Sequence, residues 1–461
     1  MTDDPQPDDD ASSTSRGSSV DGPYQIKSEN TFPRSHLIHT IIGAEETYSR
    51  SLLSSGHGFA FWDIDGSHLR GPQSTEQQDA VWLQGMSLGD VGMIDPHGQF
   101  IFLFNIFATA TDPLHQGVVP EEFEEFRPSL NRDSEVKVIP EYFKSGTIIS
   151  SMGVNIKRIS DSPLKISMSS TVREGAILVL PHGGSREDLI STSQLTEYIE
   201  RHALDWYQYT CQHARSSART IPNGSLYLIT GCDRAKSWCA MAFPSKWKDA
   251  GKQIEMTYEG EEFPCWLPSR WAREQTLSLS EGKDRNFCVF ARGIHISLSN
   301  RLWVRHLPYR PPDEASYYNI LAAPVLGFRA KIARIRERLM RDSDFLWDGH
   351  QKFPFHPSVL ISQVLLEQHP TADIALVEDS VWTDLAKNGT GTLPEVTNWI
   401  IQAIMTSELV KLNRLVSLVS KASDSPAASA MGFIQGLLAK YANWRARNRV
   451  LRQVTKVLRS P

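Results

Sequence analysis

Apolar residues along the first two-thirds of the chain follow the patterns of β-strands and predict a strand-rich domain over residues 58–308. Met86–Ile94 and Gln99–Phe107 are predicted to pair as a hairpin, because Asp95-Pro-His-Gly98 between them supplies the fixed and positive φ angles of a tight turn. The second arm contains the continuous apolar run Phe100–Phe104, so we expect it to be a central, buried strand. Further strands are predicted at 147–151, 164–169, 175–180, 225–230, 237–243 and 287–298.

One long helix is predicted inside this domain, because apolar residues there recur at intervals of three and four. They are Leu195, Tyr198, Ile199, Ala203 and Trp206. His202 shares their face of the helix, and we expect it to be a core residue rather than a metal ligand. A run of strands around a single helix indicates an α+β domain with a largely antiparallel sheet.

The periodicity becomes helical after two consecutive prolines, which predicts a mainly α-helical region over 312–424. Within it we expect helices at 356–367 and 394–421 and one short strand at 372–377. A Ser- and Pro-containing break then precedes a last helix, 426–461, whose apolar residues follow a heptad-like spacing.

The composition is that of a folded protein that is not secreted. Hydrophobic residues make up 40% of the 461 positions, which is enough for a sizeable core. No apolar run approaches the roughly 18 residues of a membrane-spanning helix, and the N-terminus lacks the basic and apolar regions of a secretory signal. The sequence therefore predicts a protein of the cytoplasm or nucleus without a transmembrane segment. Residues 1–35, rich in Asp, Ser and Gly, are predicted to be a disordered acidic leader.

The cysteines do not indicate a disulfide framework or a zinc site. There are five in the whole chain: Cys211, Cys232, Cys239, Cys265 and Cys288. None belongs to a Cys-x-x-Cys pair, and no paired histidines lie beside them. We therefore expect buried free thiols, and we predict no metal site from these residues.

Charge is divided unevenly along the chain. The segment 426–461 holds seven of the 48 basic residues and none of the 53 acidic ones, which leaves an acidic body with a basic amphipathic helix at its end. Such a helix suits an acidic protein or an anionic membrane surface. Nucleic acid is not favoured, because few aromatic residues alternate with the basic ones. The predicted contact residues are Lys440, Trp444, Arg445, Arg447, Arg449, Arg452 and Lys456. The same pattern is also expected of a helix that packs on the body with its basic face in solvent.

Several segments between residues 58 and 390 resemble a family of uncharacterised proteins from mushroom-forming (basidiomycete) fungi. They include Gly175–Pro181, Ser185–Leu189, Gly224–Asp233, Cys288–Gly293, His356–Val359 and Ala372–Val377. The resemblance implies a fungal origin. It implies no activity, because no activity is known for that family.

One motif carries enzymatic chemistry. The apolar run Phe59–Trp62 ends in Asp63-Ile-Asp65-Gly, which resembles the first motif of haloacid-dehalogenase-type phosphohydrolases. There the first carboxylate would attack the phosphoryl group and the second would protonate the leaving group beside a Mg²⁺ ion. Glu378-Asp379 could complete the metal site. The Gly-Asp-x-x-x-Asp motif of those enzymes is missing, and an Asp-Gly turn after a strand explains the same residues.

The remaining patterns do not define a catalytic set. The chain contains no Walker A, no His-Glu-x-x-His and no dinucleotide-binding glycine motif, and His350 and His356 lack the spacing of metal ligands. We therefore predict a non-enzymatic intracellular binding or regulatory protein that contacts an anionic partner through its basic C-terminal helix and needs no cofactor. The alternative is a metal-dependent phosphohydrolase that uses Asp63 and Asp65 with Mg²⁺.

Overall fold

A computed structural model describes residues 43–64, 85–307 and 356–419 of the chain. Within these ranges it omits 96–97, 116–117, 128, 160–164, 171, 173, 217–220, 244–253, 260–264, 267–272, 278–286, 388–401, 405–406 and 413. All of the described residues belong to one compact unit, Ser35–Pro461. The predicted leader 1–35, the predicted helical segment 312–355 and the basic segment 426–461 lie outside the described residues.

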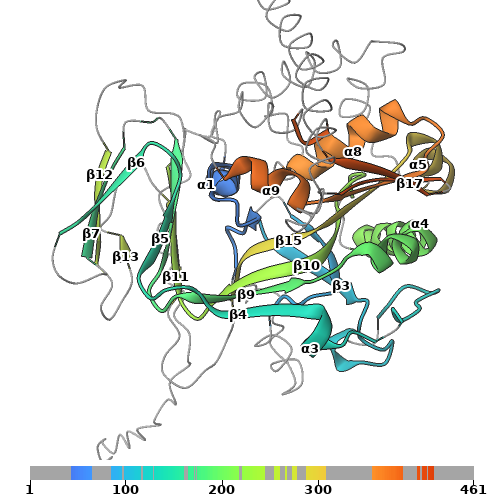
Figure 1. Cartoon of the computed structure of the whole chain (residues 1–461), viewed down its shortest axis with the longest axis horizontal. Coiled ribbons are helices and arrows are strands. Elements are labelled where there is room, and N and C mark those ends of the chain that lie inside the picture. Colours follow the sequence, from blue (N-terminus) through green and yellow to red (C-terminus); the bar gives the residue numbers. More distant parts are fainter. Residues whose placement is uncertain are drawn as a thin grey trace, which may run out of the picture. The chain divides into compact units, whose positions relative to one another are not determined.

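The centre of this unit is a mixed sheet of 10 strands (Figure 1). Its main path is β17 (Glu408–Leu412), β18 (Leu415–Val419), β16 (Ile374–Glu378), β15 (Phe287–Leu298), β10 (Leu226–Ala235), β2 (Asp90–Ile94) and β3 (Phe100–Asn105). Off this path, β1 (Phe59–Ala60) pairs with β15, β9 (Gly184–Leu189) pairs with β10, and β4 (Val136–Phe143) pairs with β9. β16 and β18 run parallel, whereas β15 runs antiparallel to β10 and β16.

Two smaller sheets lie beside the central one. The first contains β14 (Arg273–Leu277), β11 (Trp238–Phe243), β8 (Gly175–Leu180) and β5 (Thr147–Ser150). The second contains β13 (Cys265–Trp266), β12 (Ile254–Glu259), β7 (Lys165–Ser170) and β6 (Val154–Arg158). Side chains of β8 alternate as strand geometry requires, with Ile177 and Val179 packing toward β7 and Leu178 and Leu180 toward α1 (Ala44–Leu52).

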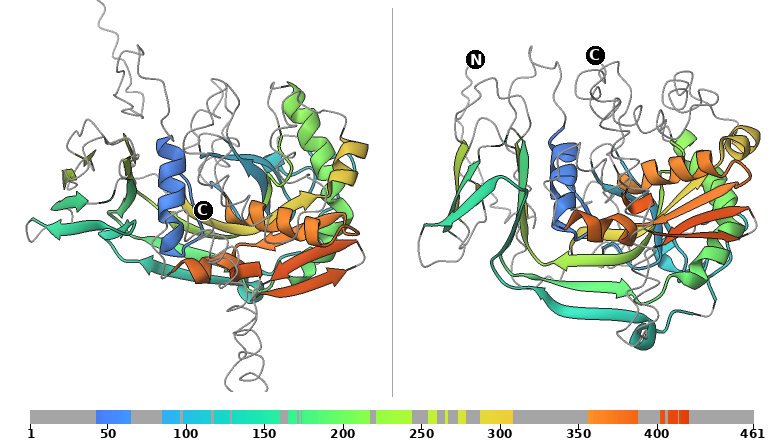
Figure 2. Two further views of the ribbon diagram at one scale, coloured as in Figure 1. Left: turned by 90° about the horizontal axis from the view of Figure 1, so that it is seen from above. Right: turned by 45° about the horizontal axis from the view of Figure 1, so that its top comes forward.

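Helices cover both faces of the central sheet (Figure 2). The long helix α4 (Ser193–Ser216) packs on one face against Ile294 and Ile296 of β15. Helices α8 (Pro357–Gln368) and α9 (Ser380–Ala386) pack on the other face against Ala375 and Val377 of β16. The shorter elements are η1 (Leu53–Ser55), η3 (Pro113–His115), α3 (Arg132–Glu135) and α5 (Asn300–His306).

The predicted fold class, α+β with a mainly α-helical C-terminal region, is wrong. Strands dominate the described residues and form a large mixed sheet. Residues 408–412 and 415–419, expected within a helix over 394–421, form β17 and β18 instead. The physical reason is that β18 pairs in parallel with β16. This pairing joins segments that are distant in the sequence, so the local pattern of residues does not predict it.

Two further expectations about strands are also wrong. β3 lies at the end of the described path of the sheet and is half-buried over most of its length, so it is not a central strand. Residues 231–235, expected to be a connection, continue β10 because they pair with β9 and β15.

Many of the expected elements are confirmed. The hairpin of β2 and β3, the strands β5, β7, β8 and β15, and the helix α4 lie where the sequence predicts them. Cys211, Cys232, Cys239 and Cys288 are buried free thiols, while the side chain of Cys265 lies outside the described residues. His202 is a core residue, and its ring is nearly parallel to that of Trp206 with the centroids 6.3 Å apart. None of the helices in the described part of the chain is long and apolar enough to cross a membrane.

Candidate functional site

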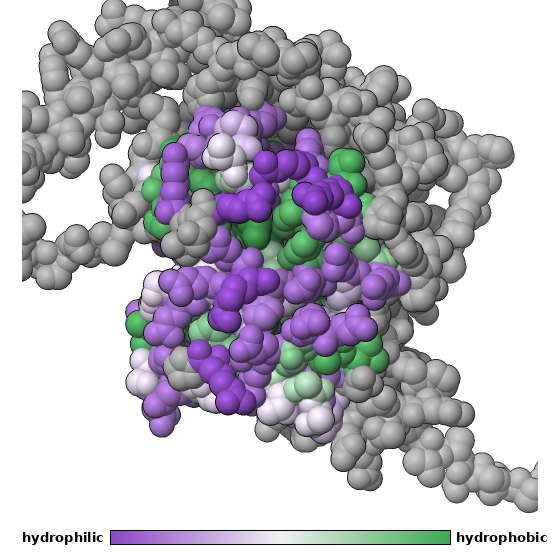
Figure 3. All heavy atoms as spheres, turned by 90° about the vertical axis from the view of Figure 1, so that its right-hand side faces the viewer, coloured by the Kyte–Doolittle hydropathy of each residue, from purple (hydrophilic) through white to green (hydrophobic). Residues whose placement is uncertain are grey.

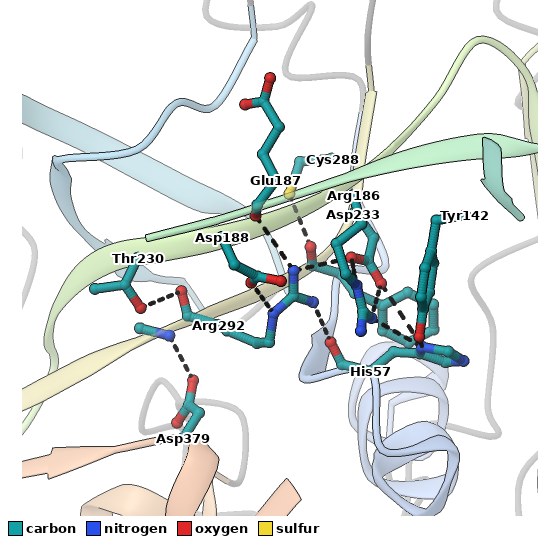
Figure 4. Close-up of polar contacts among 12 residues, drawn as sticks. His57, Tyr142, Arg186, Glu187, Asp188, Thr230, Asp233, Cys288, Arg292 and Asp379 are labelled. Atoms are coloured by element: carbon teal, nitrogen blue, oxygen red, sulfur yellow. Dashed lines mark hydrogen bonds and ion pairs between the residues drawn. The ribbon is translucent and has the colours of Figure 1, made fainter. Parts of the chain in front are cut away.

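A group of charged residues gathers where β10 changes its neighbour on one side. β10 pairs with β2 at Tyr227 and Leu228 and with β9 from Gly231 onward. Residues that face each other on paired strands share one face of the sheet. We call the group that results the ion-pair cluster; it consists of His57, Arg186, Asp188, Asp233 and Arg292 (Figure 4).

Asp233 is the centre of the ion-pair cluster and is fully buried between two arginines. Arg186 donates from Nε to Oδ1 at 2.7 Å and from Nη2 to Oδ2 at 2.6 Å, which is a bidentate pair. Nη2 of Arg292 lies 2.9 Å from Oδ1. Two guanidinium groups therefore compensate one buried carboxylate, and their second charge is balanced by Asp188, whose Oδ1 accepts from Nε of Arg292 at 2.6 Å.

His57 is held in one protonation state by this cluster. Arg186 donates from Nη2 to Nδ1 of His57 at 3.0 Å. A guanidinium can only donate, so Nδ1 accepts and the proton of the neutral ring is on Nε2. Burial is the main reason that the pKa of His57 falls to about 4, and the charges of Arg186 and Arg292 add to it. The arginines of this cluster are thus engaged with groups of the protein itself.

A second polar group is buried on the other side of β15. We call it the histidine cluster; it consists of His295, His356 and Asp379. His295 is on β15, His356 is the N-cap of α8, and Asp379 is the N-cap of α9. Their ligand atoms all lie within 4.8 Å of one another, and all three residues are buried. Three elements far apart in the sequence therefore present polar side chains to one point in the core.

Asp379 anchors the histidine cluster to its surroundings through four donors. Oδ1 accepts from Ser358 Oγ at 2.7 Å and from Trp382 Nε1 at 3.1 Å. Oδ2 accepts from Gly293 N at 2.9 Å and from the Tyr227 hydroxyl. Burial raises the pKa of Asp379, while the hydrogen bonds from side chains act in the opposite direction. Since Gly293 follows Arg292, the backbone of β15 links this cluster to the ion-pair cluster (Figure 4).

The two imidazoles differ in the hydrogen bonds that they make through Nδ1. Nδ1 of His295 lies 3.1 Å from the carbonyl of Gly224, so it donates and leaves Nε2 with a lone pair. Nδ1 of His356 accepts from the backbone N–H of Ser358 at 3.2 Å. Neither Nε2 atom has a hydrogen-bond partner among the described residues, although both are buried. Burial lowers the pKa of each ring to about 3, so both are neutral at physiological pH.

The histidine cluster is the group of described residues whose donor atoms fit a metal ion. His356 Nε2 and Asp379 Oδ1 are 3.7 Å apart, a gap that two metal–ligand bonds of about 2.0–2.2 Å each can span. To bind through Nε2, His356 must give up its bond from Ser358 N–H, and an N-cap bond contributes about 1 kcal/mol. Structural zinc contributes about 10 kcal/mol or more, so this cost is small by comparison. Trp382, if displaced from Asp379, keeps Ser358 Oγ as an acceptor at 2.9 Å.

Asp63 does not come together with the Glu378-Asp379 pair that was expected to complete its metal site. β1 pairs with β15 so that Phe59 faces Ala291 and Ala60 faces Phe290, which directs Asp63 toward the Phe287 end of β15. Asp379 binds at Gly293, six residues farther along, or roughly 20 Å at about 3.3 Å per residue. Glu378 turns away to the hydroxyls of Thr192 and Ser380.

Other predicted site residues are outside the described part of the chain. They are Asp65, Lys440, Trp444, Arg445, Arg447, Arg449, Arg452 and Lys456.

No protein-family model matches this chain, and no curated protein matches it. Sequence reasoning missed the histidine cluster because its members are far apart along the chain. The available signal was local: His356-Pro357 and Asp379-Ser380 each stand at the beginning of a helix.

Proposed function

We propose that this protein is a non-enzymatic binding or regulatory protein of the cytoplasm or nucleus, and that its basic C-terminal segment contacts an anionic partner. The observation that carries the proposal is the division of charge: residues 426–461 hold seven basic side chains and no acidic one. An anionic membrane surface and an acidic protein both fit this chemistry. We also propose, from the sequence resemblance, that the chain belongs to the basidiomycete family.

The described part of the chain supports this assignment because many of its arginines pair with carboxylates of the protein itself. Those that pair with a carboxylate of the protein are Arg50, Arg132, Arg186, Arg201, Arg234, Arg292, Arg301 and Arg414. Figure 3 shows one face of the molecule, on which hydrophilic residues surround smaller hydrophobic areas. We therefore expect an anionic partner to bind through the seven basic side chains of the C-terminal segment.

The proposal is tested by binding to vesicles with and without anionic lipid. Full-length protein is compared with a chain that ends at Asp424 and with the triple variant Arg445→Gln/Arg449→Gln/Arg452→Gln. Each basic residue near an anionic surface contributes about 1 kcal/mol, so the triple variant should partition roughly 100-fold more weakly. The matched control removes three exposed lysines of the body, Lys137, Lys144 and Lys157, and should bind like the unmodified protein.

An acidic polypeptide serves as the second probe and separates the two kinds of partner. If the full-length protein binds the acidic polypeptide but not the vesicles, and if truncation abolishes and salt weakens this binding, the partner of the segment is an acidic protein. Equal binding of the full-length and truncated proteins to each probe would contradict the proposal.

The phosphohydrolase alternative receives no support from the strand register, which keeps Asp63 away from Asp379. Its test remains simple. Turnover of a phosphate ester that requires Mg²⁺ and is lost in Asp63→Asn would restore it.

A further inference from the structure

We propose that His295, His356 and Asp379 bind one divalent transition-metal ion, of the class of Zn²⁺ or Fe²⁺, at the junction of β15, α8 and α9. This site is independent of the C-terminal segment, so either proposal can fail without the other. It also differs from the Mg²⁺ site of the phosphohydrolase alternative, which needs Asp63.

The first argument is the state of the two imidazoles. His295 is 2% exposed and His356 is 4% exposed, and the Nε2 atom of each lacks a hydrogen-bond partner in the described part of the chain. Buried polar atoms in folded proteins are almost always satisfied. Each ring also places one nitrogen within 4.8 Å of a nitrogen of the other ring and of a carboxylate oxygen of Asp379, so a common partner would satisfy both rings.

The second argument is the support around the ligands. Metal-binding histidines usually donate their other ring N–H to a carbonyl or carboxylate, which fixes the tautomer. His295 does so, because its Nδ1 is bonded to the Gly224 carbonyl. Its ring is also held in place by stacking on Tyr227, with centroids 4.3 Å apart. Asp379 is oriented by Tyr227 and by the backbone of Gly293.

The third argument selects the class of ion. Two imidazole nitrogens and one carboxylate oxygen suit Zn²⁺ and Fe²⁺, whereas Mg²⁺ and Ca²⁺ prefer sites made of oxygen atoms. The ion-pair cluster offers no comparable site, because its carboxylates are compensated by Arg186 and Arg292.

A buried water is the competing occupant, because it could bridge the same atoms. The two occupants are distinguished by measuring how many metal ions the protein retains per chain. Untagged full-length protein is stripped with a chelator, incubated with Zn²⁺, desalted and measured for zinc per chain. The same protein is titrated with Co²⁺, whose visible absorption reports nitrogen ligation.

The variants are chosen so that the fold is retained. His356→Asn removes the imidazole but keeps a side chain that caps helices well. His295→Gln keeps a polar side chain on β15. His182→Ala is the matched control, since it removes an exposed histidine outside the cluster. Circular dichroism and thermal melting of the chelated proteins show whether each variant is folded.

We expect about one Zn²⁺ per chain in the unmodified protein and in His182→Ala. Loss of a ligand should weaken binding at least 100-fold, because even residues behind the ligands contribute 10–100-fold. The proposal is overturned if the unmodified protein retains no zinc, or if folded His356→Asn and His295→Gln variants retain it as well as the control. The Co²⁺ titration needs no substitution, and a spectrum without nitrogen ligation would overturn the proposal even if the variants fail to fold.

Discussion

Gly231 of β10 lies directly opposite Arg292 of β15, and the space above the glycine is occupied by the ion pair between Arg292 and Asp188. A Cβ atom at position 231 would lie 2.1 Å from Asp188 Oδ1 and 2.8 Å from Arg292 Nε. The glycine is required for this close approach, so the ion-pair cluster depends on a position that carries no charge.

Gly231→Ala should lower the free energy of unfolding by about 1–2 kcal/mol, because the methyl group displaces Asp188 from Arg292. Urea denaturation measures the loss. Thr230→Ser is the neighbouring control; it keeps the hydroxyl that donates to the Arg292 carbonyl at 3.4 Å and should change stability by less than about 0.5 kcal/mol. In an Asp188→Ala background the cost of Gly231→Ala should shrink, and a cost that stays the same would show that the clash lies elsewhere.

Asp233→Asn should be far more damaging than the loss of an ion pair at the surface. The substitution leaves Arg186 and Arg292 facing each other across a neutral group, and breaking a buried pair in this way costs about 3–5 kcal/mol. Arg132→Gln removes the 3.3 Å contact with Glu187, in which Arg132 is 58% exposed, and should cost less than about 1 kcal/mol. Equal losses in the two variants would mean that Asp233 is not the centre of the cluster.

Local patterns are sufficient to predict the strands and the helix that bury a regular set of apolar residues. β15 contains the apolar run Phe287–Ala291 followed by alternating apolar residues, and α4 repeats its core residues at helical spacing, so both could be located. The segment of β17 and β18 misled the prediction because Leu409, Leu412 and Val416 also fit a helical spacing. Pairing with β16, which is distant in the sequence, decides the outcome.

The two clusters could not be predicted for a related reason. Asp233 and Arg234 were expected in a connection between two strands, because the partners that allow them to be buried come from β9 and β15. His356 could not be assigned to a site from its position at a helix start alone, because His295 and Asp379 approach it only when α8 packs on the sheet. Spacing along the chain indicates a cluster of this kind only when its members belong to one local element. His295, His356 and Asp379 belong to three.

Asp90 should make stability depend on pH near neutrality. Its buried carboxyl accepts from Ser87 N at 2.6 Å and from Asn105 Nδ2 at 2.7 Å, and burial raises its pKa to about 7. The folded state therefore keeps a proton that the unfolded chain, with a pKa near 3.9, has released. The stabilisation from this group is complete below about pH 4 and is lost as the pH rises through about 7.

Urea denaturation of the unmodified protein and of Asp90→Asn, at intervals between pH 4.5 and 7.5, isolates this contribution. The asparagine cannot titrate, so the stability of the unmodified protein relative to the variant should decrease with rising pH. The limiting slope is about 1.4 kcal/mol per pH unit, which corresponds to one proton. A difference that is constant over this range would show that Asp90 is ionised throughout.

Tyr227→Phe tests whether Asp379 holds α8 and α9 against the sheet. The substitution preserves the stacking surface for His295 but removes one of the four donors to the buried carboxylate. Removing one partner of a buried polar group costs about 1–3 kcal/mol, so the free energy of unfolding should fall by that amount. Tyr209→Phe is the control, because the Tyr209 hydroxyl donates to the neutral carbonyl of Val118 at 3.2 Å, and its loss should cost about 1 kcal/mol or less.

Hydrogen exchange distinguishes a local from a global effect of Tyr227→Phe. Amides of α8 and α9 should lose protection before those of α4 if Asp379 is the anchor of this side of the sheet. A uniform loss of protection across all three helices would show instead that Tyr227 supports the sheet as a whole.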